Sequence, residues 1–175
     1  MKRTFCLLVL GLTMSLTGLA AGPQMIVFKT PTCGCCGKWV DHMKANGFEA
    51  KVNEVPSTAE YRRKFGVPEK LLSCHTAVVQ GYAIEGHVPA EDVLRLLKLK
   101  PKGKGLAVPG MPIGSPGMEQ GARRDPYSVL LFDEKGGVSE FKRYSARWRD
   151  SKCARRAGRT ETPQALHSRF LPRSE

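Results

Sequence analysis

The stretch QMIVFKTPTCGCCGKWV, residues 24–40, carries an apolar run, a cysteine-rich turn and the start of an amphipathic segment in direct succession. The run at residues 24–29 is rich in side chains that favour strands, and Pro31 ends it, so we predict a buried first strand here. The following residues 36–46 carry apolar side chains at helical spacing and end at Asn46-Gly47, which predicts a helix. The cysteines therefore lie between a strand and a helix.

Further along the chain, strand and helix patterns continue to alternate. We expect a strand at residues 48–54, a helix at 57–65 opened by a capping box from Ser57 to Glu60, two strands at 76–80 and 82–85 joined at Gly81, and a helix from Pro89 with Val93, Leu94, Leu96 and Leu97 on its apolar side. This β-α-β-α-β-β-α order, after a strand–cysteine turn–helix opening, predicts an α/β fold. It favours a thioredoxin-like small mixed sheet with flanking helices.

Residues 101–126 interrupt this pattern. Gly and Pro are so dense here that we expect no regular structure, and the segment is either a linker or an ordered functional loop that carries Met111 and Met118. Residues 127–133 and 138–144 then predict a C-terminal β-hairpin.

The N-terminus has the three parts of a secretory signal peptide. Lys2 and Arg3 precede an apolar stretch, and small residues with a suitable cleavage position after Ala20 or Ala21 close it. A membrane anchor is the alternative, but Gly, Ser and Thr interrupt the apolar stretch. We therefore expect an exported, periplasmic protein that has no membrane association once the signal is removed.

Part of the formal net charge of +12 comes from residues 146–175, which hold eight basic and three acidic residues. This Arg-rich segment has few apolar residues, so we interpret it as a basic disordered tail. In the centre of the chain the lysines are scattered, and aromatic residues do not interleave with them as a base-stacking surface requires. We therefore expect no nucleic-acid partner.

Three thiols, those of Cys33, Cys35 and Cys36, lie within four consecutive positions at the start of the predicted helix. The unpaired amides and partial positive charge of a helix N-terminus favour thiolate, which is the form that attacks disulfides and binds metal ions. The fourth thiol is Cys74, immediately before the predicted strand at 76–80. In a thioredoxin-like fold this position faces the cysteine turn, so we expect Cys74 to complete a four-sulfur set.

Three interpretations of these thiols compete. A metal–thiolate site is favoured, because soft sulfur ligands select copper(I) or zinc. A thiol–disulfide oxidoreductase fits the two-residue spacing of Cys33 and Cys36, although Cys35 offers a competing partner. Structural disulfides suit an oxidising compartment, but disulfide geometry makes three cysteines in one turn a poor arrangement for them.

Other side chains are weaker candidates. His75 adjoins Cys74 and is either a ligand, a donor to a ligand or a core residue. Met111 and Met118 have thioether sulfurs suited to copper(I). We expect His42 to face solvent, His87 to cap a helix or lie at the surface, and Cys153 to have no role.

Four blocks of the sequence carry a family resemblance: TPTCGCCGKWV at 30–40, SCHTAVV at 73–79, IEGHVPA at 84–90 and GLAVPGMPIGSPGME at 105–119. Together they resemble the domain-of-unknown-function 411 family of metal-binding proteins, which includes periplasmic copper-resistance proteins. The resemblance extends over about residues 25–144. It implies a thioredoxin-like fold, export, and copper(I) held as a multinuclear sulfur-bound cluster. By this resemblance the family cysteines fall on Cys33, Cys35, Cys36 and Cys74, and the methionine loop falls on Met111 and Met118.

These observations lead to one functional hypothesis and one alternative. The hypothesis is a periplasmic metal-binding protein that holds copper(I), with zinc as the alternative ion, in copper resistance or homeostasis, together with other periplasmic copper-handling proteins. The alternative is a thioredoxin-like thiol–disulfide or copper oxidoreductase; we expect binding rather than catalysis. We divide the chain into a signal peptide at 1–21, a thioredoxin-like metal-binding domain at 22–100, a loop and hairpin at 101–145 that complete it, and the tail at 146–175.

Overall fold

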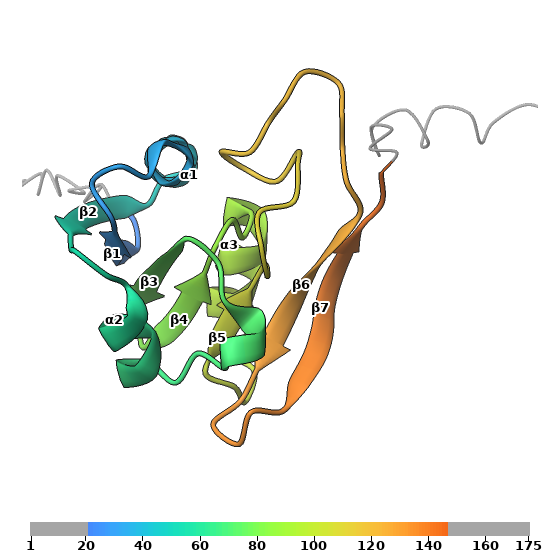
Figure 1. Cartoon of the computed structure of the whole chain (residues 1–175). Coiled ribbons are helices and arrows are strands. Elements are labelled where there is room, and N and C mark those ends of the chain that lie inside the picture. The colour runs from blue at the N-terminus through green and yellow to red at the C-terminus, as the bar shows by residue number, and fades with distance from the viewer. Residues whose placement is uncertain (1–20, 147–175) are drawn as a thin grey trace, which may run out of the picture.

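A seven-stranded mixed sheet forms the centre of the structure, a computed structural model that describes residues 21–146. Its strands are β1 (Gln24–Lys29), β2 (Glu49–Glu54), β3 (His75–Val79), β4 (Tyr82–Glu85), β5 (Gly105–Ala107), β6 (Tyr127–Phe132) and β7 (Val138–Tyr144), in the spatial order β2-β1-β3-β4-β5-β6-β7 (Figure 1). The pairs β1–β2 and β4–β5 are parallel, and the other four neighbouring pairs are antiparallel. The class α/β with a small mixed sheet and a C-terminal hairpin is therefore confirmed.

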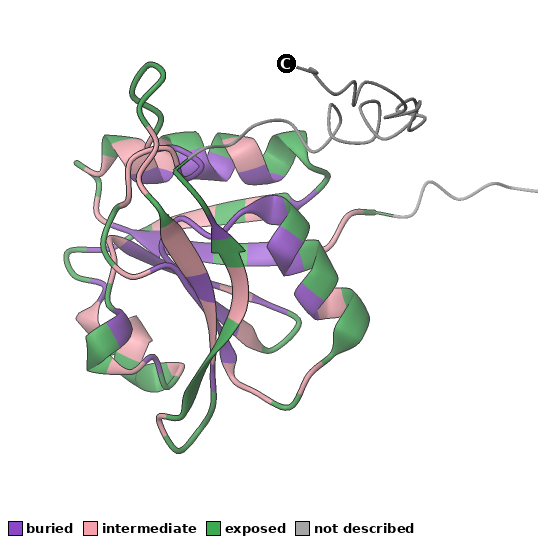
Figure 2. Cartoon of the chain, turned by 90° about the vertical axis from the view of Figure 1, so that its right-hand side faces the viewer, coloured by how far each residue is buried: buried purple, intermediate pink, exposed green. Residues whose placement is uncertain are grey.

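Helices lie on both faces of the sheet. Successive side chains of a strand point to opposite faces, so both faces carry apolar side chains that the helices cover. Helix α1 (Gly34–Ala45) and helix α3 (Ala90–Leu99) share the larger core, where Trp39 and Val93 meet strand residues such as Val27. Helix α2 (Ala59–Lys64) lies on the other face, where the Phe28 ring stacks on Tyr61 at 3.9 Å between ring centroids. A short 3-10 helix, Glu69–Leu71, adds Leu71 to the smaller core on this side. Figure 2 shows buried residues concentrated on the sheet and on the inner sides of the helices.

The helices differ from the sequence expectations in their ends and faces. Helix α1 begins at Gly34, two residues before its predicted start at Cys36, so Cys35 also lies inside the first turn. Helix α2 begins at Ala59, and the Ser57 hydroxyl accepts the Ala59 N–H at 3.2 Å instead of the Glu60 N–H that a capping box requires, so the capping-box prediction is wrong in detail. On α3 the Leu94 side chain is 41% exposed, because the apolar stripe follows Val93 and Leu96 instead.

The Gly/Pro-rich segment 101–126 does contain regular structure, contrary to expectation. Strand β5 lies within it and connects β4 to the hairpin of β6 and β7. A Cβ atom at Gly105 would lie 1.8 Å from the carbonyl oxygen of Ala83, so glycine permits the close approach of these two strands. A residue type usually associated with loops is here required by the sheet.

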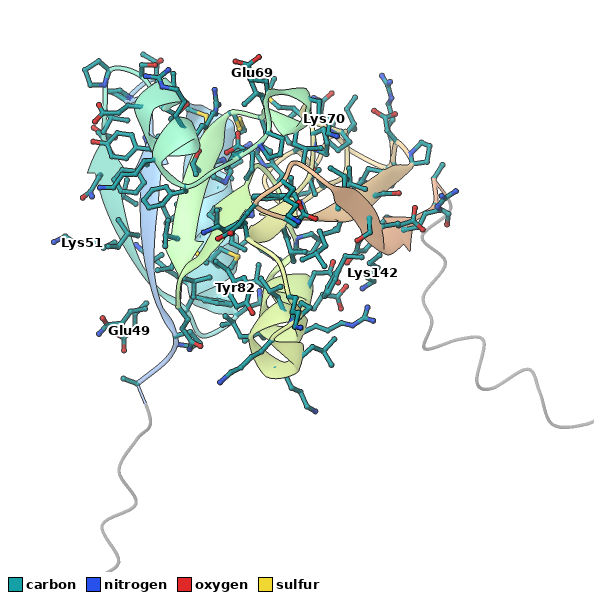
Figure 3. All side chains as sticks on the ribbon, turned by 90° about the horizontal axis from the view of Figure 1, so that it is seen from below. Glu49, Lys51, Glu69, Lys70, Tyr82 and Lys142 are labelled. Carbon is teal, nitrogen blue, oxygen red and sulfur yellow. A yellow bond between two sulfur atoms is a disulfide. The ribbon has the colours of Figure 1, made fainter. Side chains whose placement is uncertain are left out.

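The two edges of the sheet carry charged side chains. Glu49 and Lys51 project from edge strand β2, whereas Lys142 lies on β7 at the opposite edge (Figure 3). Glu69 and Lys70, also labelled there, belong to the 3-10 helix. Such charges oppose pairing with further strands. Within residues 21–146, no helix is both long and apolar enough to cross a membrane. The predicted signal peptide and basic tail lie outside the described residues, apart from the residues at their inner ends.

Candidate metal centre

The cysteine turn is built by the chain leaving β1. The Cys33 N–H donates to the Thr30 carbonyl at 3.1 Å, which reverses the chain and makes Cys33 the N-cap residue of α1. Cys35 and Cys36 follow in the first helical turn, where backbone amides lack intrahelical acceptors. Three cysteines thus gather at the positive end of one helix.

Cys74 reaches the same place through the sheet. Strand β3 runs antiparallel to β1 with His75 opposite Lys29, so the residue before β3 lies beside the point where the chain leaves β1. As a result, the sulfur atoms of Cys33, Cys35, Cys36 and Cys74 all lie within 4.8 Å of one another. The four predicted cysteines are brought together.

The four sulfurs are in two chemical states. Cys33 and Cys36 form a disulfide, and Cys35 and Cys74 are free thiols. The Cys35 sulfur lies 3.6 Å from that of Cys33, close enough to compete for the disulfide. Cys36 is buried, whereas Cys33, Cys35 and Cys74 are partly exposed. A reagent from solvent therefore reaches the disulfide sulfur of Cys33 and the thiols of Cys35 and Cys74 before it reaches Cys36.

Two histidines extend the site on the side of Cys74. The Cys74 sulfur lies 3.0 Å from Nε2 of His87 and 3.3 Å from Nδ1 of His75. His87 Nδ1 lies 2.8 Å from the Pro116 carbonyl, which can only accept, so the Nδ1–H donates and the Nε2 lone pair faces the sulfur. Nε2 of His75 is the one buried side-chain nitrogen or oxygen without a hydrogen-bond partner among residues 21–146. Cys74, His75 and His87 form a second group with metal-ligand spacing.

Burial keeps this part of the site uncharged. Burial, and next the neighbouring Cys35, raise the pKa of Cys74 to about 12. Burial also lowers the pKa of His87, and it lowers the pKa of His75 far more, with His87 and Arg62 adding to the effect. The imidazoles are therefore neutral at pH 7, which is the form that binds metal ions.

The methionine loop, which carries Met111 and Met118, lies against helix α1, which carries Cys35 and Cys36. Gly117 adopts a positive φ of 84°, and a Cβ atom there would lie 2.7 Å from the Cys35 carbonyl oxygen. The next residue, Met118, is therefore beside the first turn of α1, and it is partly exposed. Met111 lies earlier in the loop and is 52% exposed, next to Gly110, whose N–H donates to the Leu72 carbonyl. Ligation by either methionine stays a prediction.

Two histidine expectations are wrong. His42 is half-buried rather than solvent-facing, and its Nε2 accepts the Ala90 N–H at 3.1 Å. His87 is fully buried beside Cys74 rather than at the surface. The register of the β3–β4 hairpin could have located His87. Thr76 pairs with Glu85 in this antiparallel pair, so Cys74, two residues before Thr76, lies opposite His87, two residues after Glu85.

Comparisons with known proteins identify relatives of this chain. The family model "Protein of unknown function, DUF411" matches residues 71–118. Two solved structures of copper resistance protein CopG, form 1 and form 2, are 40% and 41% identical to this chain, each with a TM-score of 0.68. They cover 71% and 70% of this chain, and the match spans 98% of each CopG chain. No curated protein sequence gave a significant match.

Proposed function

Since this chain belongs to the DUF411 family that includes copper resistance protein CopG, we propose that it binds copper and acts in copper resistance or homeostasis. The observation that carries the proposal is the set of four cysteine sulfurs within 4.8 Å of one another. Thiolate sulfur is soft and polarisable, and it selects copper(I) over the harder ions that prefer oxygen. Copper(I) is therefore the first choice of cargo.

The donor atoms of this site fit such an ion. Cys33, Cys35, Cys36 and Cys74 supply the sulfurs, and the imidazoles of His75 and His87 face Cys74 with nitrogen atoms. Four sulfurs that share a space this small suit several ions bridged by thiolates as well as a single one. Met118 adds a thioether from the covering loop.

Full binding requires reduction of the Cys33–Cys36 disulfide. Two electrons and two protons convert the disulfide to two thiols, and each thiol releases its proton when it binds the ion. The oxidised form keeps only the sulfurs of Cys35 and Cys74 as free thiols in this cluster. Copper(I) affinity is thus expected to depend on the redox state.

A second candidate function is redox chemistry, and the disulfide itself favours it. Two copper(I) ions can each give one electron to the Cys33–Cys36 disulfide, which takes up two protons and becomes two thiols, with two copper(II) ions as the product. A dithiol substrate can reduce the same disulfide by exchange through a mixed disulfide. The cysteine spacing supports both reactions.

The proposal includes the finer expectations on location and fold. Residues 1–21 direct export to the periplasm, where other copper-handling proteins are the partners that exchange the ion. Residues 22–100 form a thioredoxin-like unit: the order β2-β1-β3-β4, with only β1 and β2 parallel, supports this. Residues 101–145 complete the domain by covering the cysteines.

Titration of the reduced mature protein with copper(I), against a chromophoric chelator, tests the proposal. We expect tight binding that the Cys33→Ser, Cys36→Ser double variant loses, and a rise in melting temperature on binding, because the ion stabilises only the folded state. The same titration with zinc decides between the two metals. Cys153→Ser is the matched control and should bind like the wild type.

Unchanged copper(I) affinity in the double variant would overturn the proposal. The Cys35→Ser, Cys74→Ser variant separates the two candidates. If it still reduces disulfide substrates at the wild-type rate while copper fails to protect the wild-type thiols from alkylation, the protein is an oxidoreductase rather than a copper-binding protein.

A further inference from the structure

We propose that Arg62 and Glu85 are positioning residues that hold Cys74 in the sulfur cluster. This inference rests on the proposed function and deepens it, because it assigns a role in that site to two residues that lie outside the set of sulfur and imidazole ligands. Arg62 comes from α2 and Glu85 from the end of β4. They meet beneath the segment that carries Cys74.

Glu85 accepts hydrogen bonds from residues on both sides of Cys74. One carboxylate oxygen accepts the Ser73 N–H at 2.8 Å, and the other accepts the Thr76 hydroxyl at 2.6 Å. The Glu85 side chain is fully buried, so water does not compete for these bonds. The backbone before Cys74 and the side chain two residues after it are therefore tied to one rigid carboxylate.

Arg62 donates hydrogen bonds both to Glu85 and to the backbone of the same segment. Its Nε donates to Glu85 at 3.0 Å, and its Nη2 donates to the Ser73 carbonyl, so one guanidinium bridges the carboxylate and the backbone. Ser73 also donates its hydroxyl to the Gly110 carbonyl, which links the same segment to the start of the methionine loop. The N–H, carbonyl and hydroxyl of the residue before Cys74 are all engaged.

A purely structural role explains this pair poorly. The fully buried Glu85 carboxylate and the Arg62 guanidinium, whose side chain is 16% exposed, lose most of their hydration, and apolar residues of similar volume are often as stabilising as such an ion pair. The pair does, however, orient the backbone. The forked guanidinium and the two carboxylate oxygens form hydrogen bonds of defined geometry, which fix the path of residues 73–76. That segment carries the cysteine that must reach three sulfurs on another element.

A double-mutant cycle on copper(I) affinity tests the inference. Glu85→Gln keeps the shape but loses one acceptor, and it should weaken binding about 10-fold in the reduced protein, as the loss of a partner that orients a ligand typically does. In a Cys74→Ser background the same change should have less than about a twofold effect, because the residue it positions is gone. Arg62→Lys should restore part of the affinity that Arg62→Met removes.

The matched control is Asp92→Asn. Asp92 is also a buried carboxylate, but it accepts the Tyr144 hydroxyl and belongs to α3. It should lower the melting temperature without changing copper(I) affinity. If Glu85→Gln does not fold, Thr76→Val removes one of the same hydrogen bonds with little change of shape and should act in the same direction.

Alkylation of Cys74 in the oxidised, metal-free protein gives a readout that does not depend on copper. Peptide mass spectrometry scores Cys74 separately from Cys35 and Cys153, and Glu85→Gln should speed the reaction at Cys74 severalfold. A wild type that fails to bind copper(I) defeats the proposed function, and this reaction still decides the positioning role. Equal affinity losses in both backgrounds, or unchanged Cys74 alkylation alongside a lowered melting temperature, would overturn the inference.

Discussion

Gly117 lies where the methionine loop touches the cysteine helix. Its φ of 84° is in the left-handed region that favours glycine, and an added Cβ would lie 2.7 Å from the Cys35 carbonyl oxygen and 2.8 Å from the Trp39 nitrogen. Both neighbours are helix backbone and cannot rotate away. A single methyl group is therefore enough to separate the loop from the site.

The Gly117→Ala variant should lose about 2–4 kcal/mol of unfolding free energy, from left-handed strain plus the clash. Its Cys35 thiol should also alkylate faster, because the loop no longer covers it. Urea unfolding and peptide mapping measure the two effects. Gly121→Ala is the control: its φ of 54° is also positive, but an added Cβ meets nothing within 4 Å, so only about 1 kcal/mol should be lost. Equal losses in the two variants would contradict the close contact.

At the scale of elements, β5 joins two parts of the sheet. It pairs parallel to β4 and antiparallel to β6, so within the sheet the hairpin of β6 and β7 is hydrogen-bonded to the remaining strands only through the three residues of β5. The side chain of Leu106 is fully buried in the larger core. The path of the loop after β5 therefore depends on how closely β5 approaches β4.

Gly105→Ala should detach β5 from β4, since its Cβ would lie 1.8 Å from the Ala83 carbonyl oxygen. We expect a loss of about 3 kcal/mol or more, with faster amide hydrogen exchange concentrated in β5 and β6. Gly37→Ala is a control in α1, where an added Cβ meets nothing within 4 Å. It should stabilise the protein by about 0.5–1 kcal/mol. If the urea midpoint of unfolding is the same for Gly105→Ala as for the wild type, β5 does not have this connecting role.

For the whole molecule, buried acidic hydroxyl and thiol groups predict sensitivity to alkali. Burial raises the pKa of Cys74, Tyr127 and Tyr144 above their ordinary values, and hydrogen bonds to Asp92 and Glu91 add to the effect at Tyr144. The folded protein then holds these protons more tightly than the unfolded chain. Their contribution to stability is complete below the unfolded-state pKa values and is lost as the pH rises above about 9–10.

Urea unfolding of the oxidised, metal-free protein between pH 7 and pH 11 should therefore show a midpoint that falls above about pH 9. Tyr144→Phe should be less stable at pH 7, because the bonds to Glu91 and Asp92 are lost, yet show a shallower fall at high pH. A midpoint that stays constant to pH 11 in the wild type would contradict the prediction.

Local pattern in the sequence was sufficient for much of the fold. The first strand, the helix that follows the cysteine turn and the C-terminal hairpin all form within about two residues of their expected bounds. These elements follow from short-range causes: apolar periodicity, Pro31 after a strand and a turn rich in glycine at Gly136-Gly137. The gathering of Cys74 with the other three cysteines was also predictable, once the order of elements suggested how β3 lies beside β1.

Only the tertiary structure decided which other groups meet at the site. His87 faces Cys74 because antiparallel register places the two opposite each other, and Glu85 and Arg62 meet beneath Cys74 because α2 lies against one face of the sheet. Gly105 belongs to a strand because of what lies beside it, not because of its own preference for loops. Periodicity records which face a residue occupies, whereas contacts between distant segments depend on strand order, register and loop path, which no short stretch of sequence contains.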